Sequence, residues 1–84
     1  MVKIVKRDGR SEDFVVEKVV VSMVKSGVPA GVAREIARNI EADVREGTST
    51  KEIRKRALEA LRARNPEWEV NWLTYDRAVK KRAE

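Results

Sequence analysis

The chain has 84 residues, with 19 Lys and Arg against 14 Asp and Glu, which gives a formal net charge of +5. It contains neither cysteine nor histidine. These absences exclude disulfides, thiolate zinc sites and cysteine nucleophiles, and they remove the commonest general base. A chain of this length predicts a single domain over residues 1–84 with a modest core. Its basic surface is expected to attract phosphates.

No apolar run approaches the roughly 20 residues that cross a bilayer. Residues 1–6 alternate polar and apolar side chains, unlike the core of a signal peptide. We therefore expect a cytoplasmic protein that does not bind membranes. Charged residues make up 39% of the chain and glutamine is absent, which is a thermophile-like bias. A thermal unfolding midpoint of about 50 °C would count against a thermophilic source.

The first element in the chain is predicted to be a β-hairpin over residues 2–14. The alternation in residues 1–6 indicates a strand, and residues 10–14 form the returning strand, with Glu12 on the same side as Phe14. Asp8-Gly9 predicts a type I′ turn, which has positive φ at both central residues. Because an isolated hairpin is marginally stable, it must pack on another element.

Two helices are predicted next, at residues 16–26 and 29–46. Gly27 and Gly47 are suited to end them, and Pro29 lies near the start of the second. The apolar face of the first consists of Val16, Val19, Val20, Met23 and Val24. The second carries an apolar residue at every fourth position, at Val32, Ile36, Ile40 and Val44.

Two further helices are predicted at residues 50–63 and 66–81. Ser49 and Glu52 fit a capping box, in which each side chain accepts a hydrogen bond from the backbone of the other. Asn65-Pro66 is a cap followed by proline at the first helical position. The last helix has an aromatic face, whose residues either stack on nucleic-acid bases or, as helical spacing favours, lie in the core: Trp68, Trp72 and Tyr75. The predicted fold is α+β, an N-terminal β-hairpin capping a four-helix bundle.

Cations gather at two places in the sequence. Lys6, Arg7 and Arg10 surround the predicted turn, where they either hold an anion or protect an exposed strand edge from aggregation. Residues 51–64 carry six cations and two acids. That pattern fits a nucleic-acid surface, but a solvated helix face is the more common case.

The sequence contains no catalytic constellation. There is no Gly-rich phosphate loop, so a nucleotide would have to be held by cationic side chains and by helix ends such as the one after Ser49. The alternative is that Ser49 and Thr50 only cap their helix. Asp43 and Glu46 are expected on the outer face of the second helix, away from any cluster. We therefore predict that the chain is not an enzyme and has no metal site of its own.

Three motifs resemble those of the ATP-cone family. The opening segment Val5-Lys6-Arg7-Asp8-Gly9-Arg10-x-Glu12-x-Phe14-x-x-Glu17-Lys18-Val19 is similar to the family's first signature. The segment from Gly47 to Ile53 resembles its second motif, and the segment from Trp72 to Arg77 resembles the aromatic and basic pattern of its closing helix. The resemblance implies a β-hairpin lid over a four-helix bundle.

The resemblance also implies a site for ATP or dATP, with Mg²⁺. It implies that Lys6 and Arg7 reach the phosphates, with Lys18 nearby, and that Ile4 and Val19 line the adenine slot. Glu12 would accept a hydrogen bond from the adenine amino group. The residues implied at the ribose or phosphates are Thr50 and Arg54, completed by Lys80 or Lys81. Paired Lys and Arg side chains suit a triphosphate, because charge-assisted bonds are the stronger ones.

Two positions depart from the family's pattern. Val15 stands where Asp or Asn is usual, which implies one polar contact fewer, and Arg54 replaces a polar or acidic residue. An altered affinity, or an altered choice between ATP and dATP, is expected from these changes.

The function implied is regulatory: control of the activity or oligomeric state of a fused or partner protein, as in similar domains of ribonucleotide reductases. One alternative is a small basic nucleic-acid-binding module. The other is a degenerate cone that serves only in interaction or in a homo-oligomer.

Overall fold

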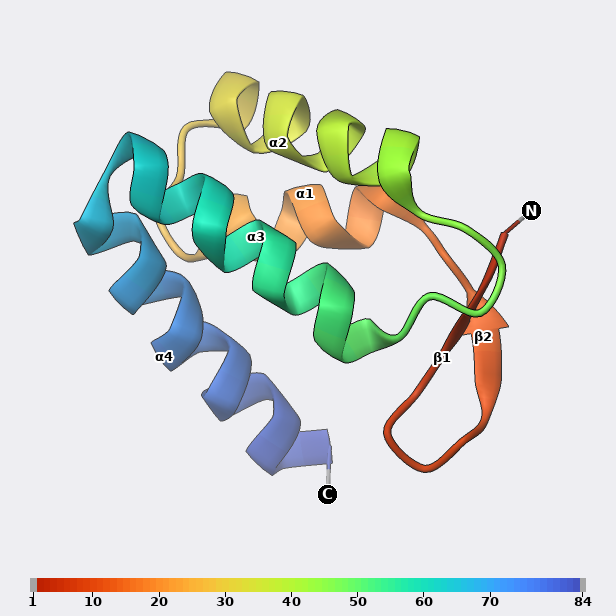
Figure 1. Cartoon of the computed structure of the whole chain (residues 1–84). Helices are drawn as coiled ribbons and strands as arrows, with labels where there is room; N and C mark the ends of the chain where they lie inside the picture. The colour runs from red at the N-terminus through yellow and green to blue at the C-terminus, as the bar shows by residue number, and fades with distance from the viewer. Residues whose placement is uncertain (1, 84) are drawn as a thin grey trace.

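The computed structural model describes residues 2–83 and confirms the predicted architecture of a two-stranded antiparallel hairpin followed by four helices (Figure 1). The hairpin lies at one end of the helical bundle (Figure 1). The elements in chain order are β1 (Lys3–Val5), β2 (Ser11–Asp13), α1 (Val16–Lys25), α2 (Ala30–Asp43), α3 (Thr50–Arg64) and α4 (Pro66–Ala83).

The hairpin turn differs from the type I′ turn that the sequence predicts. Lys6 N donates to Arg10 O (2.7 Å) and Gly9 N donates to Lys6 O (2.9 Å), so three residues form the loop. Gly9 has a φ of +89°. Asp8 does not have the positive φ that a type I′ turn requires, because in the described chain only glycines have a positive φ. A turn followed by a glycine in the left-handed region is the usual three-residue hairpin loop. The Asp8 carboxylate stabilises it by accepting from Arg10 N (3.1 Å) and Arg10 Nε (2.7 Å).

The register of the hairpin turns one face toward the bundle. Ile4 pairs with Glu12, and Val5 pairs with Ser11. Because side chains alternate along a strand, Ile4 and Phe14 point to the same face, and both are buried in the core. This packing supplies the support that an isolated hairpin lacks.

The opposite edge of β1 is fastened to the loop between α2 and α3. Val5 N donates to Thr48 O (3.0 Å), and Gly47 N donates to Lys3 O (2.9 Å). Lys3 N donates to the Glu46 side chain (2.7 Å). Strand β1 is therefore held on both edges, by β2 and by this loop, and the loop leads directly into α3.

Helix α2 ends at Asp43, three residues earlier than predicted. Val44 continues the apolar spacing and is buried, but its backbone is extended (ψ 133°). The chain then turns at Gly47, which has a φ of +84°. Leaving the helix at this point lets Gly47 and Thr48 pair with β1, so Glu46 does not lie on the outer face of α2 as expected.

The core draws on β1, on the four helices and on residues of the connecting segments, and its most deeply buried side chains come from the first three helices. Met23, Ile36 and Leu61 are the largest fully buried side chains. Ala33 and Ala37 are also fully buried and let α2 approach its neighbours closely. Val24, at the edge of the apolar face that the sequence predicts for α1, is 41% exposed.

Local capping chemistry explains where α3 and α4 begin. Ser49 Oγ accepts from Glu52 N (3.1 Å), which confirms one half of the predicted capping box. The Glu52 side chain lies instead beside Arg56 (3.5 Å). Asn65 Oδ1 accepts from Glu67 N (3.0 Å), and α4 begins at Pro66 as predicted.

Candidate functional site

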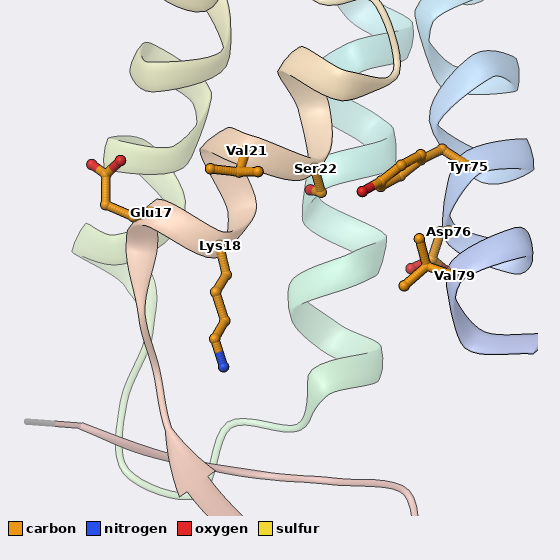
Figure 2. A pocket seen from close by; sticks show the side chains of 7 residues that line it. All are labelled: Glu17, Lys18, Val21, Ser22, Tyr75, Asp76 and Val79. Atoms are coloured by element: carbon orange, nitrogen blue, oxygen red, sulfur yellow. The ribbon is translucent and has the colours of Figure 1, made fainter. Parts of the chain in front are cut away.

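Helices α1 and α4 enclose an open groove of about 360 Å³. This volume lies at the lower end of the range of about 300–1,000 Å³ that is typical of small-molecule sites. Most of the surface area that lines the groove is apolar. The lining residues come from two turns of each helix (Figure 2): Glu17, Lys18, Val21, Ser22, Tyr75, Asp76 and Val79.

Two neighbouring charges at the start of α1 serve different contacts. Glu17 accepts from Arg34 of α2 (2.7 Å), and the Arg34 guanidinium lowers the pKa of the Glu17 carboxyl below its usual value. Lys18 is exposed, and its side chain extends from α1 toward the strands, away from Glu17 (Figure 2). Lys18 therefore brings a positive charge to the side of the groove that faces the hairpin.

An ion pair between α3 and α4 adjoins the groove. Arg54 Nη2 lies 2.8 Å from Asp76 Oδ2, and the two side chains are 32% and 19% exposed. Asp76 also lines the groove together with Lys18. Arg54, a predicted site residue, is thus paired with a carboxylate that lines the groove, and no local sequence pattern singled out Asp76.

A hydrogen bond from α4 to α1 holds the two walls of the groove together. Trp72 Nε1 donates to Ser22 Oγ (3.1 Å), and Ser22 Oγ donates to Val19 O (2.8 Å). Trp72 is 6% exposed, which confirms its predicted place in the core. Tyr75, three residues later, is half-buried and lines the groove.

The hairpin carries four of the predicted site residues. Lys6 Nζ lies 3.3 Å from Glu12 Oε2, so these two side chains meet on the face that Ile4 shares. Arg7 is exposed at the tip, whereas Ile4 is 6% exposed and belongs to the core cluster.

The remaining predicted residues lie on three helices. Val19 is half-buried against the core, and Thr50 is the first residue of α3, next to the Val5–Ser49 bridge. Lys80 and Lys81 lie near the end of α4, and their side chains are outside the described part of the structure. The starts of α1 and α3 and the end of α4 all lie at the hairpin end of the molecule (Figure 1).

Comparison with known protein families identifies the family of this chain. The family model for the ATP cone domain matches residues 2–71 of the 84. The chain is a member of the ATP cone domain family. Comparison with curated proteins gave no match.

Membership makes this ATP cone domain a nucleotide-binding regulatory module in general terms. The family match contains β1, β2, α1, α2 and α3 but only the first part of α4. Tyr75, Asp76 and Val79, which form the α4 wall of the groove, lie beyond the matched segment.

Membrane-spanning helices and clusters of metal ligands are both absent from the described chain. No helix between residues 2 and 83 is both long enough and apolar enough to cross a bilayer. In the same part of the chain, no three acidic side chains gather closely enough to hold a metal ion.

Proposed function

We propose that this ATP cone domain binds ATP or dATP at the hairpin end of its helical bundle, and that occupancy controls the activity or oligomeric state of a fused or partner protein. One observation carries the proposal. Lys6 and Glu12 on the hairpin, Lys18 on α1 and Arg54 on α3 belong to elements that meet at one end of a fold whose family binds nucleotides.

The chemistry of these residues divides the site between base and phosphates. Glu12 is half-buried beside Ile4 and Val19 is half-buried on α1, so an adenine placed between the hairpin and α1 finds apolar contacts and a carboxylate acceptor. Lys6, Arg7 and Lys18 are exposed cations suited to the triphosphate.

The start of α3 offers a second kind of phosphate contact. The first backbone N–H groups of a helix favour anions, although the Glu52 N–H at the start of α3 already donates to Ser49 Oγ. The side chains of Lys80 and Lys81 are proposed to complete the phosphate site. Mg²⁺ commonly binds proteins through substrate phosphates and few protein ligands, so we expect it to arrive with the nucleotide.

The charged face of α3 gives little support to a nucleic-acid surface. Four of its arginines are engaged in ion pairs with acids of α2 or α4: Arg54, Arg56, Arg62 and Arg64. Each pair places the cation against the protein's own helices. We therefore propose the nucleotide, and not a nucleic acid, as the partner of this domain.

The test is a calorimetric titration of the full chain with ATP, dATP and GTP in magnesium buffer, together with NMR of the backbone amides. We expect saturable binding of an adenine nucleotide and shifts at residues 7–9. Amide signals at the hairpin tip that stay in place at millimolar ATP would contradict the proposal. DNA binding that survives high salt, or dimers in light scattering that are independent of ATP, would favour the two alternatives.

A further inference from the structure

The Arg54–Asp76 pair differs from the other ion pairs of the chain in its burial. Among the ion pairs between described side chains, it is the one in which both partners are less than one-third exposed. Screening by water and salt weakens exposed pairs, and it weakens partly buried pairs less. Asp76 therefore holds Arg54 more firmly than a surface carboxylate would.

Arg54 retains hydrogen-bonding capacity that Asp76 does not use. Its Nε atom is shielded from solvent and has no hydrogen-bond acceptor within the described residues. A guanidinium presents several donors in one plane, and it binds carboxylates and phosphates with the same geometry. A phosphate at the edge of the groove would therefore compete with Asp76 for the same cation.

We propose that Asp76 is an internal competitor for Arg54, so that the phosphates of a nucleotide must displace its carboxylate to reach this guanidinium. The inference rests on the proposed function, because it concerns the same nucleotide. Displacement breaks the partly buried Arg54–Asp76 ion pair, which has a cost in free energy. Asp76 thus lowers affinity and makes the contact between α3 and α4 depend on occupancy.

The competition sets this chain's affinity through a residue outside the segment that matches the family. The match ends at residue 71, and Asp76 is one turn beyond Trp72 on α4. Arg54, inside the matched segment, is therefore controlled by a carboxylate that lies outside it.

Calorimetric titration of Asp76→Asn with ATP tests the inference. We expect an affinity at least about tenfold tighter than that of the parent chain, and the same factor for inorganic triphosphate, which carries no base. Asp43→Asn is the matched control, because Asp43 also pairs with an arginine of α3 (Arg56, 2.7 Å) and its loss changes the net charge equally. The control should bind ATP within about twofold of the parent.

A double-mutant comparison removes the dependence on one variant. In Arg54→Met the competed-for cation is gone, so adding Asp76→Asn to Arg54→Met should bring no gain in affinity. Removing both partners of a buried pair also costs less stability than removing one. Asp76→Ser should show the same gain as Asp76→Asn, which guards against a folding defect specific to one substitution.

The outcomes separate this inference from the proposed function. If the parent chain binds ATP but Asp76→Asn and Asp76→Ser bind it no more tightly, Asp76 is not a competitor and the proposed function stands. A gain of equal size in Asp43→Asn, or a gain that persists in the Arg54→Met background, also overturns the inference. If neither the parent nor the Asp76 variants bind ATP, both the inference and the proposed function are wrong.

Discussion

Trp72 of α4 donates its indole N–H to the Ser22 hydroxyl of α1 across 3.1 Å, although 50 residues separate them in the chain. Ser22 Oγ in turn donates to Val19 O at 2.8 Å, so two consecutive hydrogen bonds connect α4 to the first turns of α1. Ser22 also lines the groove. These two hydrogen bonds therefore fix the spacing of the groove walls, and they also satisfy the buried indole N–H of Trp72.

Ser22→Ala is expected to destabilise the protein by about 1–3 kcal/mol, because a buried donor that loses its acceptor retains its full desolvation cost. Urea unfolding followed by circular dichroism measures this change. Ser26→Ala is the matched control, since Ser26 Oγ makes a similar bond to Met23 O (2.7 Å) without crossing to another helix. Equal losses in the two variants would show that the bond to Trp72 contributes nothing of its own.

Lys6→Ala is expected to weaken ATP binding by about 1–3 kcal/mol, the typical worth of a charge-assisted contact. The Lys6–Glu12 pair is largely exposed, with side chains 44% and 35% exposed, so it should compete only weakly with a phosphate. Calorimetry measures the change, and Lys25→Ala at the far end of α1 is the control for net charge. Unchanged affinity in Lys6→Ala would remove Lys6 from the site.

Glu12→Ala should reduce the preference for ATP over GTP, because the adenine amino group then loses its carboxylate acceptor. The quantity to compare is the ratio of the two dissociation constants. Loss of Glu12 also releases Lys6, which raises affinity for both triphosphates. Asp13→Ala is the control, since Asp13 lies on the other face of β2 and pairs with Lys3. A ratio that is the same before and after would exclude Glu12 from base recognition.

Val15→Asn should stabilise the protein by about 0.5–1 kcal/mol by capping α1. Val15 is the N-cap residue with an extended backbone (φ −114°), and α1 has no side-chain cap. Comparison with Val15→Ala in urea unfolding separates the new cap from the lost packing. If Asn is no more stable than Ala, the backbone at residue 15 does not present a usable cap.

Local chemistry allowed most of the fold to be predicted from the sequence. Ser49 and Asn65 cap the helices that follow them, and the alternation in residues 1–6 correctly indicated a strand. Periodicity failed at Val44, because a residue that leaves a helix can still fill the next position of its apolar stripe. The Asp8-Gly9 dipeptide predicted the wrong turn type, because pairing between Lys6 and Arg10 leaves a three-residue loop.

The groove could not be predicted because its contacts join distant segments. Tyr75 is three residues after Trp72, which places it about 60° around the helix, on the shoulder of the buried face. Whether a shoulder residue faces core or solvent depends on how α4 crosses α1, and no local pattern encodes that crossing. The Arg54–Asp76 pair is of the same kind, since it depends on the packing of α3 against α4.

The protein should be less stable at acidic pH than at neutral pH, because four exposed carboxyls have a lowered pKa in the folded state. A hydrogen bond from a neighbouring cationic residue stabilises the anionic form of each carboxyl. The four pairs of donor and carboxyl are Arg10 with Asp8, Lys3 with Asp13, Arg34 with Glu17, and Arg64 with Glu35.

A carboxyl whose pKa is lower in the folded than in the unfolded chain binds fewer protons when folded. Its contribution to the stability of the fold is therefore fully present above the ordinary pKa values of 3.8 for Asp and 4.5 for Glu, and it is lost as the pH falls through the pKa of the folded state.

Thermal unfolding midpoints should stay level from pH 7 to about 5.5 and fall below about 4.5. Glu17→Gln should make the fall shallower, as one of the four groups no longer titrates. Added salt should do the same, because it screens exposed pairs. A midpoint that is independent of pH down to about 3 would show that these carboxyls titrate alike in the folded and unfolded chains.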